Sequence, residues 1–143
     1  MADLQEAAAW VASVKECRAW AGPGITYPIR IEQLADEIGL TPENAFVLKE
    51  GGNRLAFGQI IQTSEHVCHL ARIIVSKRHR GKGIGRVFCR KLIQEAERSP
   101  GICRLTLRVY RHNHAAVKLY QSLGFRETGK PQNATAMSMT LIL

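Results

Sequence analysis

The spacing of apolar residues predicts a series of helices and strands. Apolar side chains recur at helical spacing over residues 4 to 19, which predicts one amphipathic helix before Gly22-Pro23-Gly24. The same spacing predicts a second, short helix that ends at Gly39. Two apolar strands, at residues 45 to 49 and 55 to 62, then flank Glu50-Gly-Gly-Asn53, whose glycines suit a hairpin turn.

The second half of the pattern alternates strands with helices. Residues 66 to 75 are rich in apolar and β-branched side chains and predict a strand, and a helical stripe follows from Ile84 to about Arg98. By the usual crossover rule, the next strand runs parallel to the strand at 66 to 75. The pattern therefore predicts a mixed α/β fold. The remaining elements are a strand at 102 to 110, a helix at 114 to 123 closed by Gly124, and a strand at 136 to 142.

Length and composition place the chain among ordinary globular proteins. With 143 residues, of which 45% are hydrophobic and 22% charged, residues 1–143 are expected to form one domain. No 18-residue apolar run is present, and the opening Met1-Ala-Asp-Leu-Gln-Glu carries acid where a signal peptide needs base. We therefore expect a soluble, cytoplasmic protein with no membrane partner.

The four cysteines do not form a metal-binding pattern. They are widely spaced, with no Cys-x-x-Cys pair and no histidine at a spacing that suits zinc. Buried free thiols and no metal are therefore expected. The cysteines are Cys17, Cys68, Cys89 and Cys103.

Three glycines spaced two apart follow the strand at 66 to 75 and open a helix. Gly81, Gly83 and Gly85 would let backbone amides approach an anion without a Cβ in the way, and the first N–H groups of a helix have no intrahelical partner. Basic residues surround this turn, so a pyrophosphate is a fitting ligand. Neither the nucleoside-triphosphate loop nor the dinucleotide pattern matches, because Arg86 occupies the place of the latter's third glycine.

The pattern Arg80-x-x-Gly83-x-Gly85 resembles the acetyl-CoA loop of the GCN5-related N-acetyltransferase (GNAT) family. A second motif stands in the family's order, and the resemblance spans residues 46 to 141. It implies a central, mixed, mostly antiparallel sheet flanked by about four helices, with the family's first strand missing. It also implies acetyl transfer from acetyl-CoA to a primary amine of a small molecule or peptide by direct attack. The second motif comprises Asn113, Ala115-Ala116, Tyr120 and Leu123-Gly124-Phe125.

The resemblance also implies which residues bind the cofactor. Tyr120 matches the tyrosine that protonates the departing thiolate, and Asn113 matches an asparagine that binds the pantetheine arm. A core aromatic and a helix cap are the respective structural alternatives. The residues expected to bind the coenzyme are Ile73, Ile74, Val75, Arg80, Gly81, Lys82, Gly83, Ile84, Gly85, Arg86, Asn113 and Tyr120.

An amine acceptor requires a base, and His69 is the first candidate. It stands eleven residues before Arg80, where related enzymes carry a base Glu or His, and an imidazole is already mostly neutral at pH 7. The structural alternatives are a core histidine whose hydrogen bonds are satisfied within the protein and a histidine that only lines the pocket. Glu65 and His66 are weaker candidates. Cys68 or Cys89 as an acetyl-carrying nucleophile is disfavoured, because neither has a histidine partner in the sequence pattern.

The sequence offers three regions that would border the acceptor pocket, and none of them carries a motif that identifies the acceptor. Trp20 and Tyr27 belong to a loop region that usually forms one wall of this pocket in the family, although they could instead close the end of the core. Arg108 replaces a glutamate found in members that acetylate protein N-termini. It would bind an acidic group on the acceptor or form a structural salt bridge. The segment Lys130-Pro-Gln-Asn133 also borders the expected pocket.

Two other functions fit parts of the pattern. The formal net charge of +8 and the basic turn suit a nucleic-acid-binding module, but that stretch has one aromatic, Phe88, on the apolar side of its helix. The pattern therefore favours the enzyme and no nucleic-acid partner. The other alternative is an acyl-CoA sensor without catalysis. The sequence does not determine the oligomeric state, and a homodimer is one of the states it allows.

Overall fold

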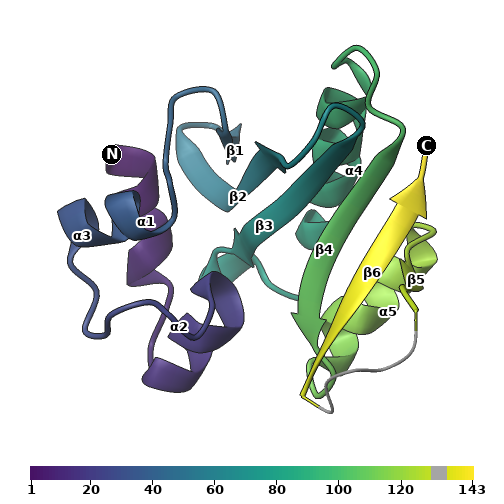
Figure 1. The fold of residues 1–143 in the computed structure, drawn as a ribbon. Coiled ribbons are helices and arrows are strands. Elements are labelled where there is room, and N and C mark those ends of the chain that lie inside the picture. The colour runs from purple at the N-terminus through teal and green to yellow at the C-terminus, as the bar shows by residue number, and fades with distance from the viewer. Residues whose placement is uncertain (130–134) are drawn as a thin grey trace. The chain divides into compact units, whose positions relative to one another are not determined.

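A computed structural model describes residues 1–129 and 135–143 and has a mixed α/β architecture (Figure 1). Within these residues the α-helices are α1 (Ala2–Ala9), α2 (Val14–Ala21), α3 (Ile31–Glu37), α4 (Ile84–Glu97) and α5 (His114–Ser122), with a short 3-10 helix, η1 (Lys77–His79). The strands are β1 (Ala45–Glu50), β2 (Asn53–Gln62), β3 (Val67–Val75), β4 (Arg104–Tyr110), β5 (Arg126–Glu127) and β6 (Ala136–Ile142).

The strands form one six-stranded sheet in the order β1-β2-β3-β4-β6-β5. β4 runs parallel to β3 and antiparallel to β6, and β1 pairs antiparallel with β2. The predicted α/β class and the parallel crossover are thereby confirmed. Residues 1–44, all of them described, contain helices and loops but no strand, as expected for a chain that lacks the first family strand.

The chain forms two compact units, and each unit is made of two separate segments of the sequence. The first unit comprises Met1–Gln59 and Arg72–Gly85, and the second comprises Ile60–Ala71 and Arg86–Leu143. The expectation that residues 1–143 are one domain stays a prediction. In the part of the chain that the structure describes, no helix has both the length and the apolar character needed to cross a bilayer.

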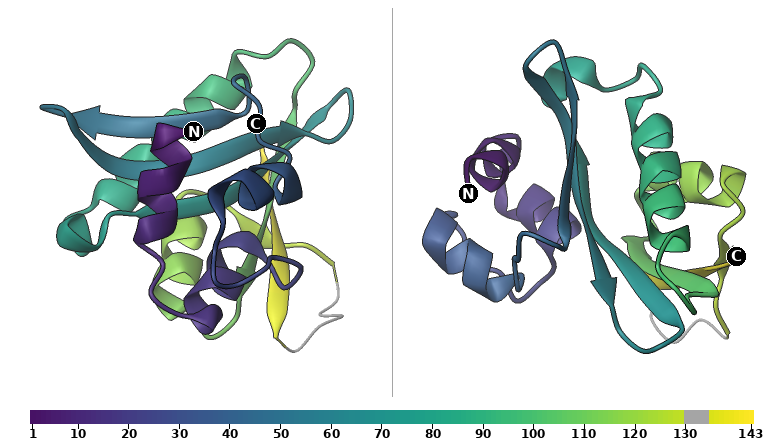
Figure 2. Two further views of the ribbon diagram at one scale, coloured as in Figure 1. Left: turned by 90° about the vertical axis from the view of Figure 1, so that its left-hand side faces the viewer. Right: turned by 90° about the horizontal axis from the view of Figure 1, so that it is seen from above.

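The core of the first unit lies between three helices and one face of the β1–β2 hairpin. Figure 2 shows α1, α2 and α3 gathered on that face. Leu4, Trp20 and Leu34 come from the helices and are buried against Phe57 of β2, and the rings of Trp20 and Phe57 meet edge-on at 6.3 Å. Aromatic side chains bury large areas in this geometry, so Trp20 and Phe57 contribute strongly to this core.

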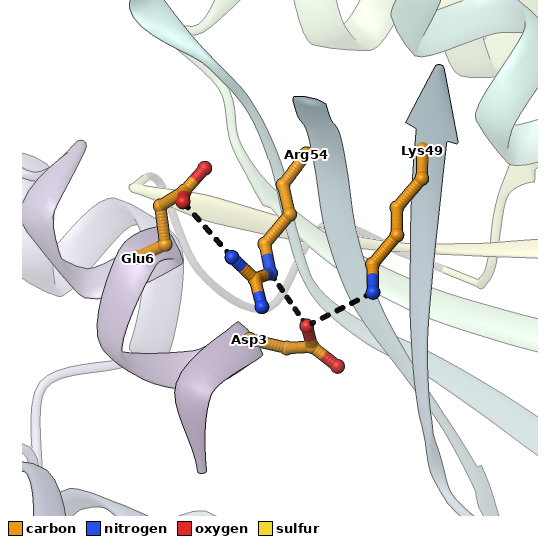
Figure 3. Close-up of polar contacts among 4 residues, drawn as sticks. All are labelled: Asp3, Glu6, Lys49 and Arg54. Atoms are coloured by element: carbon orange, nitrogen blue, oxygen red, sulfur yellow. Dashed lines mark hydrogen bonds and ion pairs between the residues drawn. The ribbon is translucent and has the colours of Figure 1, made fainter. Parts of the chain in front are cut away.

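Ion pairs tie α1 to the β1–β2 hairpin (Figure 3). Arg54 donates from Nε to Asp3 Oδ1 at 2.6 Å and from Nη1 to Glu6 Oε1 at 3.1 Å, and Lys49 Nζ lies 3.9 Å from the same Asp3 oxygen. The two carboxylates raise the pKa of Arg54. Because Asp3 and Glu6 are three residues apart on one helix face, a single guanidinium fixes the rotation of α1.

The single helix predicted for residues 4 to 19 is wrong, because the chain breaks there into α1 and α2. Ser13 is extended and caps α2, accepting a hydrogen bond on Oγ from the Glu16 N–H at 3.1 Å. Glu16 reaches back to accept from the Ala12 N–H. This arrangement resembles a capping box, in which two otherwise unpaired donors are satisfied reciprocally. With this split the described residues contain five α-helices, where about four were expected.

Replacing the cap should destabilise the first unit. We expect Ser13→Ala to lower the free energy of unfolding by about 1 kcal/mol, because the Glu16 N–H loses its acceptor. Ser13→Asp retains an acceptor and should stay close to wild type. Urea denaturation measures both variants. Equal stability of Ser13→Ala and Ser13→Asp would contradict a capping role.

The hairpin turn forms as predicted, with Glu50 opposite Asn53. Gly51 and Gly52 have φ of 56° and 84°, a conformation that side chains with a Cβ rarely adopt. Positive φ at both central residues is the signature of a type I′ turn, whose twist matches that of the flanking strands.

The core of the second unit packs α4 and α5 against β4 and β6 (Figure 2). On β4, Leu105, Leu107 and Val109 are buried while their neighbours are not, which is the alternation of a strand with one covered face. Phe125 is fully buried and meets the ring of Tyr120 edge-on at 6.0 Å. β5 went unpredicted, because two residues carry no readable period. The buried residues of α4 are Phe88, Cys89, Leu92 and Ala96.

Three of the four cysteines are buried free thiols, as predicted, but Cys103 is exposed. Its backbone N–H donates to the His66 carbonyl at 2.9 Å, so the residue is held just before β4 begins. Cys103 precedes the strand, so the alternation that buries Leu105 does not extend to it, and its thiol lies 3.6 Å from the same carbonyl oxygen. The prediction that all four thiols are buried is therefore wrong.

Candidate active site

The turn between β3 and α4 has the geometry of an anion cradle. Gly81 and Gly83 have φ of 76° and 79°, and an added Cβ at either would meet no atom within 4 Å. These glycines are therefore required by conformation rather than by space. Ser76 anchors the start of the turn, donating its N–H to the Leu55 carbonyl at 2.8 Å. The turn then opens α4 at Ile84, whose first N–H groups lack intrahelical acceptors.

Basic side chains surround this turn without acidic partners among the described residues. Arg80 donates from Nε to the Val75 carbonyl at 3.1 Å, which leaves its two Nη groups available. Lys77, Arg78 and Lys82 are exposed. Backbone donors at a helix start combined with Arg and Lys suit a diphosphate, so the residues present fit the coenzyme that the sequence predicts.

Arg86, also predicted to bind the cofactor, already has a protein partner. Its Nη1 donates to Ser122 Oγ at 2.7 Å, and Ser122 donates in turn to the Leu119 carbonyl at 2.6 Å. The contact ties the start of α4 to the end of α5. Sequence reasoning missed Ser122, because nothing local links residues 36 positions apart.

Asn113 caps α5. Its Oδ1 accepts from the Ala116 N–H at 3.4 Å, so the structural alternative for this residue is confirmed. The cap uses only the carbonyl oxygen of the amide. Its Nδ2 group keeps two donors, and the predicted bond to a pantetheine carbonyl needs one of them.

Tyr120 is a buried phenol in the second unit. Burial, and secondarily the neighbouring Cys89, raise the pKa of Tyr120 well above its usual range, so the hydroxyl keeps its proton. Its ring packs on Phe125, which confirms a core role for the aromatic part. No described residue accepts a hydrogen bond from the hydroxyl. The side chain is thus a protonated phenol held in place by its ring, and its role as the proton donor to the thiolate stays a prediction.

His69 is paired with β4. It lies opposite Thr106 in the parallel register, and its Nδ1 is 2.8 Å from Thr106 Oγ1. That contact involves Nδ1 and helps to fix the orientation of the ring. A role of His69 as the base stays a prediction. Sequence reasoning missed Thr106. The weaker base candidates are more open: the Glu65 side chain is 93% exposed, and His66 Nδ1 contacts the Gly101 carbonyl at 3.0 Å.

The buried thiols are unsuited to nucleophilic catalysis. Burial raises the pKa of Cys68, and it raises the pKa of Cys89 to about 12. A thiol attacks as its thiolate, which is scarce at neutral pH in such surroundings. These raised pKa values agree with the expectation that neither cysteine carries the acetyl group.

The predicted acceptor residues have different surroundings. Trp20 is 8% exposed and donates from Nε1 to the Arg72 carbonyl at 2.8 Å, whereas Tyr27 is exposed. Arg108 is exposed and forms no ion pair with any described residue, so the structural salt bridge expected for it is absent there. The segment Lys130-Pro-Gln-Asn133 lies outside the described residues. Contact of Trp20, Tyr27 and Arg108 with an acceptor stays a prediction.

Comparison with known proteins decides the family. Residues 9–125 match the family model described as the acetyltransferase (GNAT) family. The chain belongs to the GNAT acetyltransferase family. The match includes the glycine turn, Asn113 and Tyr120, so the GNAT resemblance read from these motifs is confirmed.

Named GNAT relatives cover parts of the chain. The [ribosomal protein bS18]-alanine N-acetyltransferase of Escherichia coli K12 is 38% identical over 82 residues, 57% of this chain and 54% of that protein. The chain thus spans about half the length of this relative. The spermine/spermidine N(1)-acetyltransferase of Bacillus subtilis is 33% identical over 61 residues, 43% of this chain and 40% of that protein. The crystal structure of the Escherichia coli ribosomal-protein-S18-alanine N-acetyltransferase matches with a TM-score of 0.66 at 25% identity, covering 92% of this chain and 90% of that one.

Proposed function

We propose that this chain transfers an acetyl group from acetyl-CoA to a primary amine by direct attack, without a covalent enzyme intermediate. The observation that carries the proposal is the turn before α4, where Gly81 and Gly83 adopt left-handed φ among exposed basic side chains. Backbone donors of this turn, with Arg80 and Lys82, would hold the diphosphate. When bound, acetyl-CoA supplies an activated acetyl thioester.

The acceptor amine must first lose a proton. A primary amine of pKa near 10.4 costs about 4.6 kcal/mol to deprotonate at pH 7. In this proposal His69 accepts that proton at Nε2, while Thr106 holds the ring through Nδ1. Support for the assignment is the fixed ring orientation, since a general base must present one nitrogen to the acceptor.

The leaving thiolate needs a hydrogen-bond donor, and we assign that role to Tyr120. Its raised pKa keeps the phenol protonated, and no described residue competes for the proton. Because a phenol is a weaker acid than a thiol, Tyr120 acts mainly by hydrogen bonding until the carbon–sulfur bond breaks. Backbone groups of Ile73, Ile74 and Val75 would bind the pantetheine as an added strand and donate to the thioester oxygen.

Calorimetry and turnover together test the proposal. The purified chain should bind CoA with a defined stoichiometry and release CoA from acetyl-CoA when a panel of primary amines is added. Binding without turnover on any amine would favour the acyl-CoA sensor. Absence of CoA binding, with salt-sensitive binding of duplex instead, would reject the enzyme in favour of the nucleic-acid module.

The pH profile tests His69. In the wild type, kcat/KM should fall at acidic pH, because a protonated imidazole can no longer accept the proton of the amine. His69→Ala should flatten this acidic limb and lower the rate at pH 7. His66→Ala, which alters the neighbouring exposed imidazole, provides the comparison. An acidic limb that persists unchanged in His69→Ala would assign the base elsewhere.

A further inference from the structure

The first unit contains a half-buried guanidinium that has no carboxylate partner among residues 1–129 and 135–143. Arg72 of β3 donates from Nη1 to Gln59 Oε1 at 3.4 Å, and no other described residue accepts from its guanidinium. Burial lowers the pKa of Arg72, but a guanidinium stays charged at neutral pH. A cation removed from water without a counter-ion is costly. The described part of the fold therefore holds a positive charge that none of its own carboxylates neutralises.

Gln59 positions this guanidinium without neutralising it. The glutamine is fully buried, and its Nε2 donates to the Ile38 carbonyl and to Asn44 Oδ1, both at 3.2 Å. These two acceptors fix which way the amide faces. Its carbonyl oxygen therefore faces Arg72, and most of the five guanidinium N–H donors have no acceptor in the part of the protein that the structure describes.

The backbone at Arg72 is also unusual. Its φ of 51° is the one positive value at a non-glycine position among the described residues. The turned carbonyl accepts the indole N–H of Trp20 at 2.8 Å, and Trp20 is itself fixed against Phe57. A left-handed conformation costs about 1 kcal/mol or more for such a residue, and strain of this kind is concentrated at functional sites.

We propose that Arg72 binds a carboxylate on the acceptor, so that the substrate is an amine that also carries an acid, such as an amino acid or an acidic peptide. This inference rests on the proposed acetyltransferase function and names its substrate class. A guanidinium grips a carboxylate through two parallel hydrogen bonds, which gives both affinity and orientation. A phosphate of the coenzyme is the other source of an anion, and the experiment below separates the two.

Overall charge supports an acidic acceptor over a polycationic one. The chain carries a formal net charge of +8, and Arg72 adds a local positive charge in low-dielectric surroundings. Both disfavour a polyamine, because like charges repel more strongly where water is excluded. Polyamines should therefore be poor acceptors for this chain.

The test compares amino acids with their carboxamides as acceptors at saturating acetyl-CoA. Wild type should favour the carboxylate form in kcat/KM by about 10- to 100-fold, the range for a charge-assisted hydrogen bond. Arg72→Gln should remove that preference, and Arg72→Lys, which keeps a point charge without the planar fork, should retain part of it. Arg90→Gln makes the same charge change on an exposed face of α4 and should behave as wild type.

Calorimetry supplies a readout that does not need turnover. N-acetylated amino acids, added with CoA present, should bind wild type more tightly than their carboxamides and should lose this difference in Arg72→Gln. Equal losses for both forms would overturn the inference. So would a raised KM for acetyl-CoA with the acceptor preference intact, which would assign the anion to the coenzyme.

Failure of the inference is distinguishable from failure of the proposed function. A wild-type chain that binds CoA and acetylates only amines without a carboxylate keeps the function and overturns the role of Arg72. A chain that does not bind CoA rejects the function, and the absence of any carboxylate preference in calorimetry then rejects the subsite as well. Thermal unfolding of each variant confirms that the compared proteins are folded.

Discussion

Replacing Tyr120 with phenylalanine should lower kcat by about 10- to 1000-fold while leaving the Kd for CoA within about twofold of wild type. The ring stays, so its edge-on contact with Phe125 is retained. Only the hydroxyl is lost, and in the described part of the chain it has no hydrogen-bond acceptor whose loss would unfold the protein. The expected defect is therefore confined to stabilisation of the departing thiolate. Single-turnover kinetics with acetyl-CoA and calorimetry with CoA measure the two quantities.

Tyr110→Phe is the matched control for that experiment. It also removes one phenolic hydroxyl from the second unit, but Tyr110 stacks on His112 at 5.5 Å and has no assigned role in the chemistry. Its kcat should be close to wild type. Unchanged turnover in Tyr120→Phe would remove Tyr120 from the mechanism, and a large loss of CoA affinity would make it a binding residue instead.

Elements with one buried face were predictable from the sequence. The helix predicted from Ile84 to about Arg98 forms from Ile84 to Glu97, because its apolar stripe is continuous and Pro100 cannot extend it. The break between α1 and α2 was missed although its signal is present. The sequence-based prediction followed the apolar spacing, which Val11 continues through the break, and did not consider the Ser13-x-x-Glu16 capping signature.

In the candidate site, features set by nearby residues were predictable from the sequence, whereas contacts between distant residues were not. The glycine turn is local, since its conformation depends on φ values that the glycines themselves permit. The partners of His69, Arg86 and Arg72 are not, because they lie 37, 36 and 13 residues away in the sequence. A charged residue inside the apolar run of β3 was a visible anomaly at Arg72. Its buried partner Gln59 and its left-handed backbone could come only from the tertiary structure.

The turn before α4 leads to the second large effect, on coenzyme affinity. Gly83 has a φ of 79°, and a valine there would face a conformation that β-branched residues avoid almost completely. Space is not the obstacle, since a Cβ would meet nothing within 4 Å. The backbone must therefore rotate, which turns the N–H groups away from the diphosphate. We expect Gly83→Val to raise the Kd for CoA by about 10- to 100-fold, measured by calorimetry.

Gly52→Val separates this effect from ordinary backbone strain. Gly52 has a nearly equal φ of 84° and equally open surroundings, but it lies in the β1–β2 hairpin rather than in the turn before α4. Both variants should lose stability, because each forces a Cβ into a left-handed conformation. Only Gly83→Val should also lose affinity for CoA. Equal CoA affinities in the two variants would mean that the diphosphate is not held by this turn, and the proposed acetyltransferase function would lose the observation that supports it.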